Sequence, residues 1–533
     1  MSKMRVLHHL VRADFLERVR RYSFLVTLAF AVYLGYCCVT GKVVVRLDEY
    51  RGVYNSAWIG CVMTLVATTF LSLIGFYIVK NTIQRDEETR VGRILATTPM
   101  TKGFYTVAKM ISNFAVLAAM VAVMAGAAVL MQFLKAEDLH VHFWALLSPF
   151  VIFALPAVAF TGALAVLFET LPVLRGGVGN VIYFFVWTAL IAAPVGSLQG
   201  GHVSQATYFT DFTGIVSVMG QMQEDLHRVD PEYKNGAALT IGNTATSKTF
   251  LWQGLRGSSA LYWSRVTCFL AAFAIALLAA LFFHRFDPAR EWAWKTSQKS
   301  GEKSFASPAN GDRVVSLPPA QTPIRLTPLL RTKSANSMPS LVLAELKLML
   351  KGHHWWWYAV AGGLFVASVA SPLEATRGGV AVVALLWPAL VWSQMGTREA
   401  RFNTGSLIFS SGHSLARQLP ALWIAGVLVA MITNGGLAIR MVIARDWEGL
   451  LAWLACSLFV PSLALALGVW SGTSKVFEAL YTAWWYLGPA NHTPGADFLG
   501  TTPYSVRPGL YLMLAGMLLL ASFLGRRAQL AYA

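Results

Sequence analysis

Residues 56–79 read SAWIGCVMTLVATTFLSLIGFYIV and contain no Asp, Glu, Lys or Arg. An apolar run of this length predicts a helix that crosses a lipid bilayer, since a span needs about 20 mostly apolar residues. Similar runs recur along almost the whole chain of 533 residues, of which 56% are hydrophobic and 13% charged. A soluble domain carries roughly 25% charged residues. The sequence therefore predicts an all-α polytopic membrane protein.

The apolar runs fall into two groups of six, so we expect about 12 transmembrane helices in two tandem six-helix halves. The first half covers residues 1–283, a flexible cytoplasmic linker rich in Ser, Pro, Lys and Arg covers 284–338, and the second half covers 339–533. The expected spans are roughly 24–40, 56–79, 104–133, 142–170, 176–196, 259–283, 355–372, 379–396, 417–437, 449–470, 475–489 and 508–525. Each half begins with an amphipathic stretch, at 5–22 and 342–351, that predicts an elbow helix on the membrane surface.

The distribution of basic residues predicts how the chain is oriented. The formal net charge is +17, and the Lys and Arg residues gather in the N-terminal segment, alternate loops and the linker. The positive-inside bias then places both termini in the cytoplasm and the acidic, partly helical segment 197–258 outside. No cleavable signal pattern follows the first apolar run. We expect a multi-pass protein of the cell (inner) membrane that contacts the lipid bilayer and no nucleic acid.

Two short charged segments, one in each half, align without a gap. The first loop copy, residues 85–99, reads RDEETRVGRILATTP, and the second loop copy, residues 398–412, reads REARFNTGSLIFSSG. Both begin with Arg and an acid, carry Gly at the eighth position, and continue with an Ile/Leu pair and a Thr or Ser pair. A solvated turn with internal ion pairs, such as Asp86 with Arg90, would account for a single copy. Its repetition favours two equivalent docking points for a soluble partner.

The chain contains no familiar enzyme, metal or nucleotide motif. It lacks the G-x-S-x-G nucleophile elbow, the H-E-x-x-H zinc pair and the G-x-x-x-x-G-K-[ST] phosphate loop. The five cysteines lie in or beside apolar runs and have no metal-ligand spacing. We therefore expect no enzyme activity, no catalytic residue, no metal site and no cofactor bound by this chain.

In its order of elements the chain resembles the permease subunits of ABC exporters of the type-2 class. The resemblance rests on the elbow 5–22, the six spans, the outer segment 197–258, and the acid, Gly and Pro at Glu88, Gly92 and Pro99. It implies a transport permease without its own nucleotide-binding domain, which exports a substrate with ATP hydrolysed by separate ABC ATPase subunits, two per chain. The ATPase-coupling residues that it implies are Arg85, Asp86, Glu87, Glu88, Arg90, Gly92 and Arg93 in the first loop copy, and Arg398, Glu399, Arg401 and Gly405 in the second.

The second loop copy departs from the family pattern. Ala400 and Arg401 stand where the first copy has Glu87 and Glu88, and Gly412 stands in place of the proline. We therefore expect the two docking points to bind the ATPase with unequal strength.

A secondary transporter of the major facilitator type, driven by an ion gradient, is the alternative. It also has six plus six spans and a central linker, but its loop pattern Gly-x-x-x-Asp-Arg-x-Gly-Arg would require Gly at Arg85 and Asp at Thr89. A membrane-embedded enzyme would need clustered His, Asp or Glu at one depth, which the sequence does not show. The few charges within the spans favour a lipid, peptide or hydrophobic drug as substrate. The identity of the substrate, the direction of transport and the identity of the ATPase stay open.

Overall fold

The computed structural model describes most of the chain, with gaps. The described residues are 3–20, 22–40, 43–135, 137–138, 140–200, 204–231, 233, 237–241, 248–284, 286, 338–351, 353, 355–402, 404–405, 414–493, 495–501 and 508–532. Most of the expected linker and residues 406–412 of the second loop copy lie outside the described residues.

The first lobe packs around α3 (Ser56–Val79), which is buried along most of its length. The helices α2, α6 and α8 all contact α3 and cover its apolar side chains. The other helices are α1 (Lys3–Val19), α2 (Tyr22–Val39), α4 (Thr82–Glu88), α5 (Val91–Thr97), α6 (Lys102–Lys135), α7 (Phe143–Pro149), η1 (Phe150–Ala154), α8 (Leu155–Thr170), α9 (Gly177–Val195) and α12 (Ser259–Phe282).

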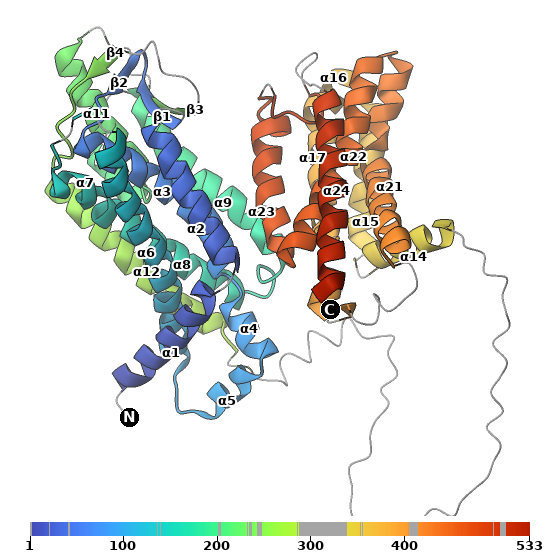
Figure 1. The fold of residues 1–533 in the computed structure, drawn as a ribbon, viewed down its shortest axis with the longest axis horizontal. Coiled ribbons are helices and arrows are strands. Elements are labelled where there is room, and N and C mark those ends of the chain that lie inside the picture. Colours follow the sequence, from blue (N-terminus) through green and yellow to red (C-terminus); the bar gives the residue numbers. More distant parts are fainter. Residues whose placement is uncertain are drawn as a thin grey trace, which may run out of the picture.

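A small four-stranded sheet covers one end of the first lobe, which we call the sheet end (Figure 1). The strand order is β3 (Ala237–Ile241), β1 (Val43–Leu47), β2 (Tyr50–Gly52) and β4 (Lys248–Phe250), so segments far apart in the chain pair with one another. β1 runs antiparallel to β2 and β3, and β2 runs parallel to β4. The remaining elements between α9 and β3 are η2 (Gly196–Gly200), α10 (Gln205–Thr210) and α11 (Ile215–Val229).

The second lobe repeats the helical arrangement of the first without a described sheet. Its elements are α14 (Met338–Leu350), α15 (Trp355–Ala370), α16 (Leu373–Ala375), η4 (Thr376–Val380), α17 (Ala381–Leu386), α18 (Ala389–Trp392), α19 (Arg398–Phe402), α21 (Ser414–Ile443), α22 (Trp447–Ser471), α23 (Ser474–Trp485), η5 (Tyr486–Ala490) and α24 (Pro508–Tyr532). α24 packs along α22 as α12 packs along α8, and α14 crosses α21 as α1 crosses α6. α17 and α18 are separate helices because Pro388 lies between them and cannot donate a backbone hydrogen bond.

The two lobes stand side by side and meet where α23 packs against α9 (Figure 1). The first turn of α23 also contacts the end of α3: the Lys475 ammonium donates to the carbonyl oxygens of Tyr77 at 3.0 Å and Lys80 at 2.6 Å. Both contacts lie toward the end opposite the sheet end, where α1, α4, α5 and α14 are found. We call this end the loop end.

The helical, multi-pass membrane character that the sequence predicts is confirmed. Within the described residues, nine helices are long and apolar enough to cross a membrane, and Thr27–Cys38 and Trp355–Ala370 are shorter apolar helices. The expected span 475–489 corresponds to the short helix α23 and the π-helical turn after it. The number of 12 spans and the membrane-surface position of α1 and α14 therefore stay predictions. The sheet was not anticipated.

Candidate functional site: the paired loop copies

The first loop copy consists of two short helices, α4 and α5, held against the loop end of the first lobe. Glu169, at the end of α8, fixes where α4 starts: its carboxylate accepts from the backbone N–H groups of Asn81 at 2.6 Å, Thr82 at 3.0 Å and Ile83 at 2.6 Å. These N–H groups have no partner within the helix, and a carboxylate there also interacts favourably with the helix dipole. The orientation of α4 is thus set by a side chain from the neighbouring span.

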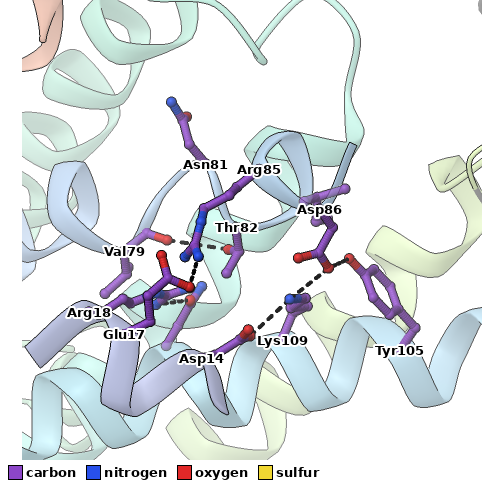
Figure 2. A network of polar contacts seen from close by, with 12 residues as sticks. Asp14, Glu17, Arg18, Val79, Asn81, Thr82, Arg85, Asp86, Tyr105 and Lys109 are labelled. Carbon is purple, nitrogen blue, oxygen red and sulfur yellow. Dashed lines mark hydrogen bonds and ion pairs between the residues drawn. The ribbon is translucent and has the colours of Figure 1, made fainter. Parts of the chain in front are cut away.

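Asp86 faces the interior of the lobe instead of solvent (Figure 2). Its carboxylate accepts from the Tyr105 hydroxyl at 2.6 Å and pairs with the Lys109 ammonium at 2.8 Å. The same ammonium lies 2.9 Å from the carboxylate of Asp14 on α1. Since the Lys109 side chain is only 1% exposed, one buried cation links the loop, α6 and α1. The internal pair of Asp86 with Arg90 that a solvated turn would form is replaced by these contacts.

Arg85 also points toward α1, where it forms an ion pair with Glu17. The next residue of α1, Arg18, donates to the side-chain oxygen of Asn113 on α6 at 2.7 Å. The network therefore contains three carboxylates and three cations, which balances its charge without any outside partner. These contacts make α1 and α4 a single rigid unit at the loop end.

The remaining residues of the first loop copy divide into anchored and exposed groups. Glu87 pairs with Arg175 in the connection between α8 and α9. Gly92 is buried, and a Cβ there would lie 2.6 Å from the ring of Phe286, so a larger residue could not pack this closely. The exposed group is Glu88, Thr89, Arg90, Val91, Arg93, Ile94, Thr97 and Pro99. It forms the surface of this loop that a second protein could contact.

The second loop copy contacts α14 and α21 in the way that the first copy contacts α1 and α6. Arg398 lies 3.6 Å from the carboxylate of Glu345 on α14, as Arg85 pairs with Glu17 on α1. Glu399 accepts from Gln418, 19 residues further along, at 3.4 Å; Tyr105 likewise follows Asp86 by 19 residues. Burial raises the pKa of Glu345 and lowers the pKa of Arg398, which shows that this pair is held away from solvent.

The cation that neutralises the buried acid differs between the two copies. In the first it is Lys109 on α6, whereas in the second Arg526 on α24 lies 2.7 Å from Glu399. The exposed residues of α19 are Ala400, Arg401 and Phe402, and the Phe402 side chain is 66% exposed. Gly405 is half-buried, and Ser406 to Gly412 lie outside the described residues.

The two loop copies border one cavity of about 280 Å³ at the loop end. The first copy contributes Glu88, with Asn81 and Gln84 just before it, and the second contributes Arg398 and Arg401. The two segments that align in sequence are therefore brought to the same face of the molecule.

A buried polar cluster lies between the lobes beside this cavity. The Lys80 ammonium donates to Asn180 at 2.6 Å and to the carbonyl oxygen of Leu174 at 2.9 Å, and Asn180 in turn donates to Glu478 on α23. The charged residues Lys475 and Glu478 in the expected span 475–489 were the only sequence signal for this cluster. Both residues lie in the first half of α23, where Lys475 contacts the end of α3.

Sequence reasoning missed Asp14, Tyr105, Lys109 and Glu169 as parts of the site. One signal was available: Lys109 is the only charged residue in the expected span 104–133, and a lone charge within a span usually has a buried partner. Among the described residues, no group of three or more His, Cys, Asp or Glu side chains could hold a metal ion.

Comparisons of this chain with protein-family models, with curated proteins and with solved structures found no match.

Proposed function

We propose that this chain is the membrane-spanning permease of an ATP-driven transporter, an exporter of the type-2 ABC class that works with separate ATPase subunits. In this proposal the chain has two six-span halves with elbow helices, lies in the cell (inner) membrane, and has its loop end in the cytoplasm. The chain itself binds no cofactor, and the ATP is hydrolysed by the partner.

The observation that carries the proposal is the equivalence of the two loop copies in three dimensions. Each begins with an arginine that pairs with its elbow helix, α1 or α14. The acid that follows is hydrogen-bonded to α6 in the first lobe and to α21 in the second. A loop that only reverses the chain would need no such anchoring. A loop that transmits force to the membrane helices would need such anchoring, because the elbow helix, the loop and the span then move together.

The exposed residues supply the contact surface for the ATPase. Ile94 is 68% exposed and Phe402 is 66% exposed, and each lies beside an exposed arginine, Arg93 or Arg401. Arginine and aromatic side chains that fill pockets on the partner often dominate binding at protein interfaces, which fits Arg93, Arg401 and Phe402. We therefore assign direct contact to the exposed residues and positioning to Arg85, Asp86, Arg398 and Glu399.

The two loop copies differ in sequence and in the cation that meets the buried acid, which supports an asymmetric machine. Ala400 and Arg401 stand where the first copy has Glu87 and Glu88, and Arg526 on α24 takes the place of Lys109 on α6. Loss of the two loop copies should therefore reduce ATPase coupling by different amounts. Equal loss of ATPase coupling in Arg85→Ala and Arg398→Ala, the two positioning variants, would contradict this asymmetry.

The test is an affinity purification of the tagged chain from gently solubilised native membranes, with ATP hydrolysis measured in the eluate. The wild type should recover an ATPase with a phosphate loop at about two copies per chain. The Ile94→Asp variant should recover no ATPase. Val229→Asp is the matched control, because Val229 is 67% exposed but belongs to α11 near the sheet end. Recovery that is unaffected by Ile94→Asp would refute the assigned surface.

A secondary transporter is the second candidate, and the buried cluster between the lobes favours it. Ionisable groups such as Lys80, Lys475 and Glu478 at the junction of two lobes could carry a coupling ion. Purification without any ATPase, together with uptake abolished by a protonophore and by Glu478→Gln, would establish that function instead.

A further inference from the structure

A second cavity lies in the first lobe, away from the loop copies. It has a volume of about 660 Å³ and is lined by residues of α8, α9, α10 and α12. Its wall is mainly apolar and includes Phe160, Leu190, Pro194, Phe209 and Phe212. This volume falls within the roughly 300–1,000 Å³ of ordinary small-molecule sites, which are also mostly apolar with a few polar groups.

Arg265 places a positive charge in this apolar wall. It lies on α12, within two turns of the first residue of that helix, and is only 5% exposed. Its Nε donates to Ser264 at 3.1 Å, and its Nη2 donates to the Tyr208 carbonyl at 3.1 Å and to the Ser217 hydroxyl at 3.4 Å. Its Nη1 is buried and has no hydrogen-bond partner among the described residues.

The nearest acid does not neutralise this arginine directly. Asp211 also lines the cavity, but its carboxylate accepts from the backbone N–H groups of Gly214 at 2.9 Å and Ser217 at 2.7 Å, and from two hydroxyls. No carboxylate of a described residue lies within ion-pair distance of Arg265. The guanidinium also lies over the ring of Phe153, 5.0 Å from its centroid, but a buried cation without a paired anion stays costly, which favours an anionic ligand at this arginine.

We propose that this cavity binds a single-chain anionic amphiphile, a long-chain carboxylate, with its head at the Arg265 guanidinium and its chain along the apolar wall. A carboxylate oxygen accepts well from a guanidinium N–H, and such charge-assisted bonds are about twice as strong as neutral ones. The hydrocarbon chain would cover Phe160, Leu190 and Phe209, which water hydrates poorly. The proposal concerns binding to this chain alone and does not depend on the ATPase.

The experiment uses the purified full-length chain in neutral detergent and a hexadecanoic acid analogue with a diazirine in its chain. After photolysis, the labelled peptides are mapped by mass spectrometry, and they should come from α9, α10 and α12. Unlabelled hexadecanoate should compete at least ten times better than hexadecanol. Hexadecanol that competes equally well would overturn the role of the charge, and displacement by inorganic phosphate alone would overturn the role of the chain.

Three variants separate recognition from folding. Arg265→Gln should lower the labelling at least tenfold, whereas Arg256→Gln, which changes an exposed arginine paired with Asp225 on α11, should not change it. Ala271→Trp narrows the cavity without touching Arg265 and should also prevent labelling. If Arg265→Gln fails to fold, Ala271→Trp still tests the site. Labelling that survives in Ala271→Trp, or that a two-chain anionic phospholipid blocks better than hexadecanoate, would refute the assignment.

Discussion

Replacing Lys109 by Met removes the buried cation that joins the loop, the elbow helix and α6. The ammonium lies 2.8 Å from Asp86 and 2.9 Å from Asp14, and its side chain is 1% exposed. Met keeps the length and apolar stem of the side chain but leaves two carboxylates facing each other without a cation. Removal of one partner from a buried ion pair costs about 3–5 kcal/mol, because the remaining charge is left uncompensated. We expect Lys109→Met to lower the free energy of unfolding by about that amount.

The assay is reversible unfolding of the purified chain in mixed micelles, titrated with a denaturing detergent and followed by tryptophan fluorescence. Lys102→Met is the matched control, since Lys102 is an exposed lysine at the start of the same helix. Its effect should stay within about 0.5 kcal/mol, as is usual for surface substitutions.

The triple variant Asp14→Asn, Asp86→Asn, Lys109→Met separates the cost of unpaired charge from the loss of shape. With these three charges removed, no carboxylate is left facing another without the Lys109 cation between them, so most of the lost stability should return. A Lys109→Met variant within about 1 kcal/mol of the wild type would refute the reasoning. A triple variant that is less stable than Lys109→Met would refute the attribution to charge.

Three further changes test other parts of the structure. Gly92→Val should destabilise the packing of α5 on Phe286 by about 1–3 kcal/mol through overpacking, seen as faster protease cleavage within the first loop copy. Gly177→Val should push the two lobes apart, because a Cβ there would lie 2.8 Å from a side chain of the second lobe, and disulfide trapping between the lobes would then weaken. Hydrogen bonding from Arg51, together with a backbone N–H, lowers the pKa of Glu137 at the sheet end. This contribution to stability is present above the unfolded pKa of about 4.3 and is lost as the pH falls through the lower folded pKa, so Glu137→Gln should flatten the pH dependence of unfolding in that range. Unchanged cleavage, unchanged trapping or an unchanged pH profile would contradict the respective expectation.

The sequence by itself determined the class of the protein and the position of its helices. Runs such as 56–79 must become helices, because lipid offers no hydrogen-bond partner to the backbone, and the described helix has the same bounds as the run. The sequence also showed the repeat of Arg, acid and Gly in the two loop copies, because a gapless alignment needs no knowledge of contacts.

Only the tertiary structure decided which side of each loop faces inward. The sequence treated Arg85, Asp86 and Arg93 alike as contact residues, yet the first two face buried or half-buried partners on α1 and α6, and only Arg93 is exposed. The sequence also did not predict the sheet or the position of Arg265 in the wall of a cavity, because both depend on contacts between distant segments. Periodicity reports what kind of surface a helix presents, whereas the partner that meets this surface comes from a distant segment and is fixed by packing alone.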